Sequence, residues 1–186
     1  MEIQFNIEEF IKQGSISNEL DYERAMIADR NLRLLSKNSV HFKNLRKKLR
    51  DLIENYENKT WSDINSVTDE KIAESDKYEK IAEQERQFIN NRKLRIKEKL
   101  KQFDLTQENL GQILGHKSKT HMSELMNGIK PFTLKDLILI NRLLEIDLNE
   151  LIPLFLSKKD HLNFQSAVIR LNKPKLKLEK EDLLFC

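Results

Sequence analysis

The chain has 186 residues, of which 34% are charged and 7% aromatic, with four Gly, three Pro and one Cys. This length suffices for one large domain or two small ones, and the scarcity of turn residues predicts a mostly helical protein. Cys186 has no partner for an internal disulfide, and residues 1–13 carry Glu where a signal peptide would be basic, so we expect a cytoplasmic protein. The most apolar stretch, residues 134–156, is interrupted by charges and predicts no membrane span.

Positive charge is concentrated in one segment, although the whole chain has a net charge of only +3. Residues 92–144 hold 11 Lys and Arg against 5 Asp and Glu, and the rest of the chain has a net charge of −3. Such asymmetry is typical of a segment that meets a polyanion.

The first ninety residues have the pattern of a helical layer. Apolar residues at helical spacing predict helices over 18–36 and 42–56. The second carries the basic run Arg46 to Arg50 opposite its apolar stripe; this run could contact nucleic acid, but such a cluster is more often a solvated face. A capping box at Ser66 to Asp69 opens a long, charge-rich helix. Its apolar spacing does not hold a strict heptad, so packing within the layer is favoured over a coiled-coil arm.

Residues 92–153 have the pattern of five short helices. The first is a basic helix that stops at Asp104, and the last ends at Pro153. The N-caps and terminating glycines that bound them are Thr106, Gly115, Ser118, Gly128, Thr133 and Asp147.

This plan resembles the Cro/lambda-repressor (XRE) helix-turn-helix family over about a third of the chain. The resemblance is carried by Leu105-Thr106-Gln107-Glu108-Asn109-Leu110, Gly115, Met122-Ser123-Glu124-Leu125 and Asn127-Gly128. Two shorter segments, Lys117-Ser118-Lys119 and Pro131-Phe132-Thr133-Leu134, are similar to those of the HigA-type antitoxins. The chain departs from the family in a longer turn between Gly115 and Met122, in Met126 where Glu is frequent, and in a tail after Pro153.

The third of these helices has the side chains of a major-groove reader. If its methionines and Leu125 face the core, a helical wheel places polar residues opposite, namely Thr120, Ser123, Glu124 and Asn127. Hydroxyls, amides and carboxylates of this kind bond base edges. Around them we expect phosphate contacts from Lys117, Ser118, Lys119, His121 and Lys130. Resemblance to the family adds Gln107 as a phosphate ligand at a helix N-terminus.

The sequence predicts neither catalysis nor a cofactor or metal. The four histidines lack HExxH spacing and companion cysteines, and phosphate-binding glycine motifs are absent. His116 and His121 are expected to line the turn between two helices.

We therefore expect an all-α protein with three parts. Residues 1–90 form an N-terminal helical region for partner binding or dimerisation, residues 91–156 the lambda-repressor-like five-helix domain, and residues 157–186 a tail. The tail could form a short β-hairpin or arm from Phe164–Leu171 and Lys175–Glu181, or be a mobile basic segment. Residues 1–7 also alternate and could be an edge strand or disordered.

Two functions fit this organisation. Both make the chain a sequence-specific repressor that binds double-stranded DNA as a homodimer on a two-fold operator. Resemblance to HigA-type antitoxins implies that the N-terminal region also neutralises a small basic, messenger-RNA-cleaving toxin. The alternative is a stand-alone transcriptional regulator without a toxin, and a protein-only adaptor that has lost DNA binding is disfavoured by the charge of residues 92–144.

Overall fold

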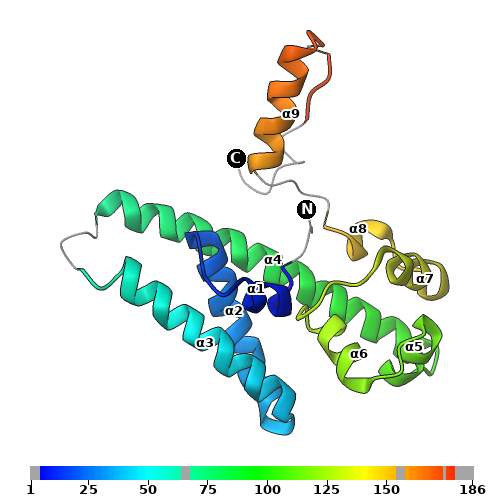
Figure 1. The fold of residues 1–186 in the computed structure, drawn as a ribbon. Helices are drawn as coiled ribbons and strands as arrows, with labels where there is room; N and C mark the ends of the chain where they lie inside the picture. The colour runs from blue at the N-terminus through cyan, green and yellow to red at the C-terminus, as the bar shows by residue number, and fades with distance from the viewer. Residues whose placement is uncertain (1–4, 64–67, 154–157, 174, 179–186) are drawn as a thin grey trace. The chain divides into compact units, whose positions relative to one another are not determined.

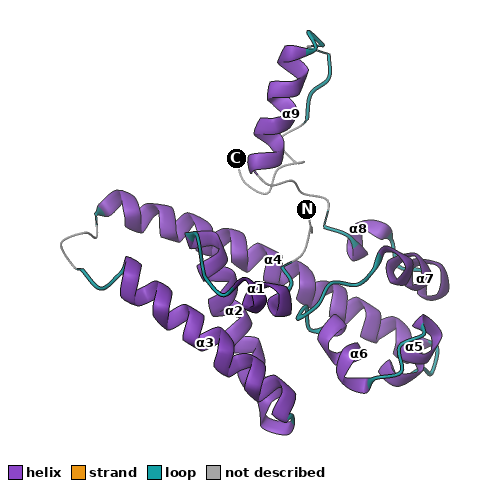
Figure 2. Cartoon of the chain, in the orientation of Figure 1, coloured by secondary structure: helices purple, strands orange, loops and turns teal. Residues whose placement is uncertain are grey.

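In a computed structural model, the described residues are 5–63, 68–153, 158–173 and 175–178, and all their regular structure is helical (Figures 1 and 2). The expected all-α class is confirmed. Residues 1–151 form one compact unit and residues 152–186 a second. The elements are α1 (Ile7–Gln13), α2 (Glu19–Leu35), the 3-10 turn η1 (Ser36–Asn38), α3 (Val40–Thr60), α4 (Asp69–Gln102), α5 (Gln107–Leu114), α6 (Lys119–Met126), α7 (Leu134–Leu144), α8 (Leu148–Leu151) and α9 (Lys158–Arg170).

Helices α1 to α3 and the first part of α4 form the N-terminal layer, and the predicted helices over 18–36 and 42–56 are confirmed as α2 and α3. Asn18 caps α2 by accepting a hydrogen bond from the Asp21 amide at 3.0 Å. The N-cap of α4 is Thr68; the Ser66 predicted for this role lies outside the described residues. Leu32 and Leu49 are fully buried where α2 packs on α3.

Helix α4 is continuous for 34 residues, so the separate basic helix expected from Arg92 is instead the C-terminal third of α4. No Gly or Pro interrupts residues 69–102, and Ile96 and Leu100 continue the buried stripe. The expected domain boundary at residues 90 and 91 therefore falls inside a helix that contributes to both halves of the unit.

Arg92 is 3% exposed, which removes it from the surface charge that the sequence indicated. Its guanidinium donates to the carbonyl of Leu151 at 3.2 Å and lies over the rings of Phe88 and Phe132. Burial lowers the pKa of Arg92 to about 10. It is a structural cation that joins α4 to the end of α8.

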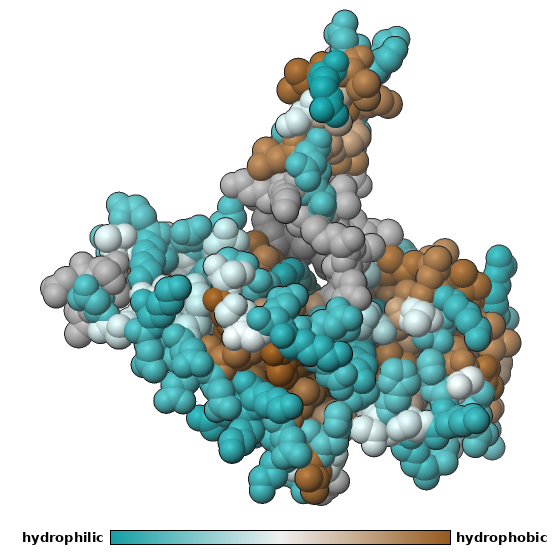
Figure 3. Space-filling view, viewed as in Figure 1, coloured by the Kyte–Doolittle hydropathy of each residue, from teal (hydrophilic) through white to brown (hydrophobic). Residues whose placement is uncertain are grey.

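The end of α4 and helices α5 to α8 form the five-helix arrangement predicted from the caps and glycines. Their core is closed by side chains that are 0–3% exposed: Ile96, Leu110, Leu114, Met122, Leu125, Ile140, Leu144 and Leu151. Leu134 and Ile138 of α7 are exposed instead. Figure 3 shows hydrophobic surface over this part of the unit.

In the second unit α9 includes most of Phe164–Leu171, for which the sequence left open a β-hairpin or arm and a mobile tail. The hairpin was wrong because Phe164, Ala167, Val168 and Leu171 repeat at three and four residues, which suits one face of a helix. The second predicted strand, Lys175–Glu181, lies outside the described residues beyond residue 178. Of the alternating N-terminus, residues 1–4 also lie outside the described residues, and Ile7 begins α1. No helix in the described ranges is long and apolar enough to cross a membrane.

Candidate nucleic-acid interface

Helices α5 and α6 are held at a fixed angle by a four-residue turn, residues 115–118. Thr106 and Asn109 form a capping box at the start of α5, and Gly115 ends it with a φ of 85° that favours glycine. Ser118 accepts a hydrogen bond from the His121 amide at 3.2 Å and so caps α6. At Gly111 an added Cβ would lie 3.6 Å from Met122 Cγ, so the two helices are in close contact there.

The start of α6 presents an exposed basic surface. Lys117, Lys119 and Thr120 are exposed, as is Ser118. Lys119 pairs with Glu108 at 2.9 Å, yet its side chain is 76% exposed and can turn toward a polyanion. Gln107 is half-buried at the first position of α5. The four positions 117–120 lie together at the start of α6, and the Lys119–Glu108 pair links them to the first turn of α5, where Gln107 lies.

Asn127 and Ser123, on the same face of α6, are half-buried and bonded to each other. The Asn127 side-chain amide donates to the Ser123 carbonyl at 2.7 Å, and Lys93 of α4 donates to the Asn127 side-chain oxygen at 2.6 Å. Base readout by Asn127 stays a prediction, and it requires release of the Lys93 contact.

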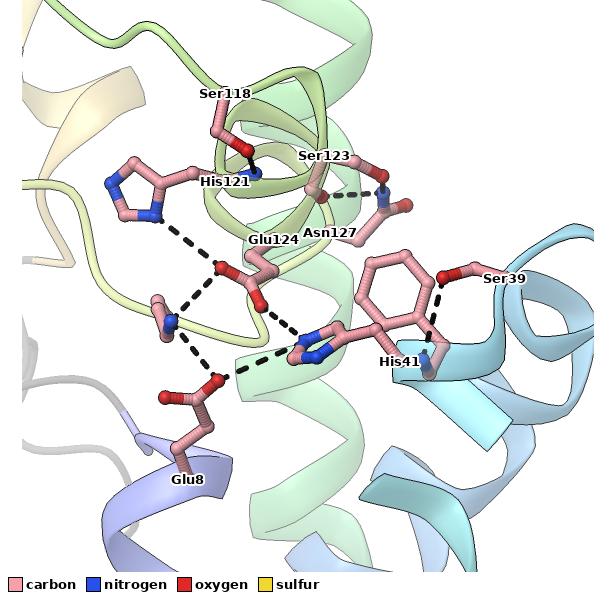
Figure 4. Close-up of polar contacts among 10 residues, drawn as sticks. Glu8, Ser39, His41, Ser118, His121, Ser123, Glu124 and Asn127 are labelled. Carbon is pink, nitrogen blue, oxygen red and sulfur yellow. Dashed lines mark hydrogen bonds and ion pairs between the residues drawn. The ribbon is translucent and has the colours of Figure 1, made fainter. Parts of the chain in front are cut away.

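Glu124 does not lie on the exposed face that the helical wheel predicts; it is 3% exposed. Figure 4 shows its carboxylate between α6 and the N-terminal layer, where His41 Nε2 lies 2.7 Å from Oε1. Lys130 Nζ lies 3.0 Å from Glu124 Oε2 and 3.0 Å from Glu8 Oε1. The wheel misplaces Glu124 because it considers α6 alone, and α1 and α3 cover this flank of the helix.

Electrostatics explain how this carboxylate remains charged inside the protein. Burial acts to raise the pKa of Glu124, but hydrogen bonds from Lys130 and His41 outweigh it and hold the pKa below its usual value. Burial likewise acts to lower the pKa of Lys130, and its bonds to Glu124 and Glu8 raise it instead. Lys130, predicted to contact phosphate, is thus engaged with two carboxylates.

The histidines of the turn have structural partners. His116 Nε2 lies 3.2 Å from Asp136 Oδ1, and Asp136 is the 2%-exposed residue of the capping box that begins α7. His121 Nδ1 lies 3.3 Å from Glu124 Oε2, and its ring meets that of His116 edge-on at 4.8 Å. Both histidines line the turn, as the sequence predicted.

Among the residues that the structure describes, one group of side chains could hold a metal ion. Glu8, His41 and Glu124 bring one potential ligand atom each within 4.8 Å of one another. The Lys130 ammonium already lies 3.0 Å from both carboxylates, so a cationic group of the protein itself neutralises this cluster. Sequence reasoning missed Glu8, His41 and Lys93, because their partners are distant in the chain and no local motif marks them.

Comparison with known proteins agrees with this geometry. Residues 96–151 match the helix-turn-helix family model. This segment is an XRE-type helix-turn-helix domain. No curated protein and no solved structure matches the chain.

The matched segment contains α5, α6 and α7 entire, together with the end of α4 and with α8. The helix-turn-helix domain places the protein among DNA-binding transcriptional regulators. In helix-turn-helix domains the second helix of the pair is the recognition helix that enters the major groove, and α6 holds that position here.

Proposed function

We propose that the protein is a sequence-specific repressor that controls its own operon, acting in the cytoplasm by binding rather than catalysis. The observation that carries the proposal is the α5–α6 pair: Lys117, Lys119 and Thr120 are exposed at the start of the recognition helix, and Gln107 begins α5. Lysines there suit phosphates and Thr120 suits a base edge.

We further propose that it binds a two-fold operator as a homodimer. Leu134 and Ile138, four residues apart on α7, are 67% and 47% exposed, and an apolar helix face of this kind supports pairing with a second copy. Sedimentation of the full chain should show a dimer, and Ile138→Glu should shift it to monomer.

Titration of the purified protein against the DNA upstream of its own gene, with scrambled duplex as competitor, tests the function. Selective binding that weakens with salt supports the proposal. Equal binding to both duplexes, or none, contradicts it and favours a role in protein binding alone.

Two variants divide the interface into its chemical roles. Thr120→Ala should relax base preference at one operator position and cost about 1–3 kcal/mol on the specific duplex. Lys119→Ala should weaken binding to specific and scrambled duplexes alike and reduce the salt slope by about 1. Loss of specificity in Lys119→Ala, or no change in either variant, would argue against this docking of α6.

The antitoxin role is the finer form of the proposal, in which the N-terminal layer neutralises a messenger-RNA-cleaving toxin. An acidic hollow of about 460 Å³ between α2, α3 and α4 supports a basic partner, because it is lined by Glu19, Glu23 and Glu57 together with Tyr22 and Trp61. Burial, and then the neighbouring Glu79 and Glu19, raise the pKa of Glu23 to about 7, so a cationic group of a partner would favour the ionised form of this carboxyl.

Co-expression with a small basic reading frame adjacent to the gene tests this role. The wild type should co-purify with that product and relieve its toxicity, whereas Glu23→Lys/Glu57→Lys should lose both effects while retaining operator binding. An isolated gene, or an adjacent product that does not bind, would favour a stand-alone regulator.

A further inference from the structure

The C-terminal third of α4 carries two lysines on the flank that borders the recognition helix. Lys93 and Lys97 are four residues apart and are therefore neighbours on the helix surface. The other flank of this segment packs toward α8, where Arg92 donates to the last carbonyl of α8 and Arg95 pairs with Glu150 at 3.1 Å. The two arginines thus join α4 to α8, whereas the lysines lie on the α6 side.

A hydrogen bond joins the lysine flank to the end of the recognition helix. Lys93 Nζ lies 2.6 Å from the side-chain oxygen of Asn127, which is the C-cap of α6. The Asn127 amide nitrogen donates in turn to the carbonyl and the hydroxyl of Ser123, one turn back on α6 (Figure 4). Ser123 and Asn127 lie on the polar face of α6, so Lys93 is in direct contact with the face that we expect to meet DNA.

Within the described residues, the Lys93 ammonium has no anionic partner. An ammonium group has three N–H donors, and Asn127 accepts from one of them. In the same part of the chain no carboxylate forms an ion pair with Lys93 or with the exposed Lys97. Burial, and then the charge of Lys97, lower the pKa of Lys93, and an anion beside it would offset both effects. The arrangement therefore suits an anionic ligand.

Groove dimensions place phosphates at this end of α6 when DNA is bound. The first residues of a recognition helix contact base edges. Helix α6 has 8 residues, so it is about 12 Å long, and the major groove is about 12 Å wide and about 8.5 Å deep. A helix of this length that starts against the bases has its other end at a groove wall, where the backbone phosphates lie. Lys93, bonded to Asn127 at that end, is within reach of them.

We propose that Lys93 and Lys97 form a second DNA-contacting surface, which binds the backbone phosphates at the C-terminal end of α6, and that Asn127 holds Lys93 in position for this contact. The proposal rests on the DNA-binding function proposed above. It commits to duplex DNA because the charge is complementary and because Lys93 is bonded to the recognition helix itself. Asn127 is then a positioning residue rather than a base reader, and the lysines fix the register of the protein on DNA without selecting sequence.

A charge-removal pair measured at several salt concentrations tests the phosphate contacts. Lys93→Gln/Lys97→Gln is compared with Lys77→Gln/Lys80→Gln, which removes the same charge from exposed positions nearer the start of α4. The probe is the duplex from upstream of the gene, measured by fluorescence anisotropy. Each lost phosphate contact lowers the salt slope by about 0.9, so the slope should fall by about 1.8 in the first pair and stay unchanged in the second. The affinity loss of the first pair should then grow about tenfold between about 200 mM and about 50 mM salt.

A double-mutant cycle tests the positioning role of Asn127. Asn127→Ala should weaken binding to the upstream duplex and to a scrambled duplex alike, so that the ratio of the two affinities stays as in the wild type. In the Lys93→Gln background the same change should cost no further affinity, because the cation that Asn127 positions is gone. A fall in the ratio, or independent losses from the two changes, would overturn the positioning role.

Lys97→Gln alone keeps the proposal testable if the half-buried Lys93 tolerates no change. Lys97 is exposed, so this variant should unfold thermally like the wild type and yet lower the salt slope by about 0.9. A wild-type slope in Lys97→Gln, or equal slopes in the two charge-removal pairs, would overturn the proposal while leaving the helix-turn-helix function intact. Failure of the wild type to bind the upstream duplex selectively would instead overturn the function itself.

Discussion

Glu124 belongs to α6, yet two of the side chains that bond it come from other places in the chain. His41 begins α3, Lys130 follows α6, and Glu8 of α1 bonds Lys130 in turn. Removing one member of such a buried group leaves the others unpaired, which costs more than the net value of the bonds. The orientation of α6 is therefore coupled to the N-terminal layer through single side chains.

Glu124→Gln should lower stability at neutral pH by about 1–3 kcal/mol, because Lys130 and His41 lose their charged acceptor. The pKa of Glu124 is lower in the folded than in the unfolded chain, so its contribution is present above the unfolded value of 4.5 and is lost as pH falls through the folded pKa. Urea unfolding between pH 3 and pH 7 should show a smaller acid-induced loss in the variant. Glu108→Gln, at an exposed carboxylate, is the control; parallel curves for wild type and Glu124→Gln would contradict the assignment.

The contribution of Glu23 to the pH dependence of stability should have the opposite sign. Burial, then Glu79 and Glu19, raise its pKa from 4.5 to about 7, so the folded state binds a proton that the unfolded chain releases, and stability falls as pH rises from 4.5 to 7. Glu23→Gln keeps the shape and removes the charge, so it should be more stable than wild type at pH 8 and equal to it near pH 4. Thermal unfolding at the two pH values measures this. A variant less stable at pH 8 would show that Glu23 is instead paired favourably when ionised.

Among the elements, caps and glycines made α5 to α7 predictable, because Thr106, Gly115, Ser118 and Thr133 act on their immediate neighbours. The continuity of α4 through residues 90 and 91 was not predictable in the same way. A polar pair, Asn90 and Asn91, resembles a boundary but does not break a helix whose buried stripe continues on either side. The error over α9 has a similar origin, since the mixed apolar spacing of Phe164–Leu171 fits both periods in a short window.

Gly128 shows how tightly the end of α6 approaches α4. Its φ is +70°, and an added Cβ would lie 2.8 Å from Ile89 Cγ2, whereas Gly14, at φ +77°, has open space around it. Gly14→Ala should cost about 1–2 kcal/mol for the left-handed backbone alone. Gly128→Ala should cost that plus about 1–3 kcal/mol for overpacking against Ile89. Equal midpoints of urea unfolding for the two variants would mean that the Ile89 side chain moves aside at no cost in stability.

At the scale of the whole chain, residues 1–151 form one unit because the segment that follows the recognition helix α6 is part of the N-terminal core. Ile129 is fully buried in the same cluster as side chains of α1, α2 and α3. Its carbonyl accepts a hydrogen bond from the Ile7 amide at 3.1 Å. Sequence patterns predicted both groups of helices. Contacts between residues more than a hundred positions apart produce no periodic pattern, so the packing of the two groups against each other could not be predicted.

The residue that joins the two halves gives the sharpest test of this union. Ile129→Ala leaves a cavity where α1 to α3 meet the end of α6, and it should destabilise by about 2–5 kcal/mol. Trp61, the one tryptophan, lies in the N-terminal layer, so its fluorescence reports that layer, while hydrogen exchange at the Ile140 amide reports the helix-turn-helix core. Since the two halves share the cavity, both probes should shift by the same free energy. Leu34→Ala, at a 63% exposed position of α2, should shift neither by more than about 0.5 kcal/mol. A change in the Ile140 exchange rate with unaltered Trp61 fluorescence would show that the helix-turn-helix domain unfolds separately. The bonds of Glu124 would then not couple the recognition helix to the N-terminal layer.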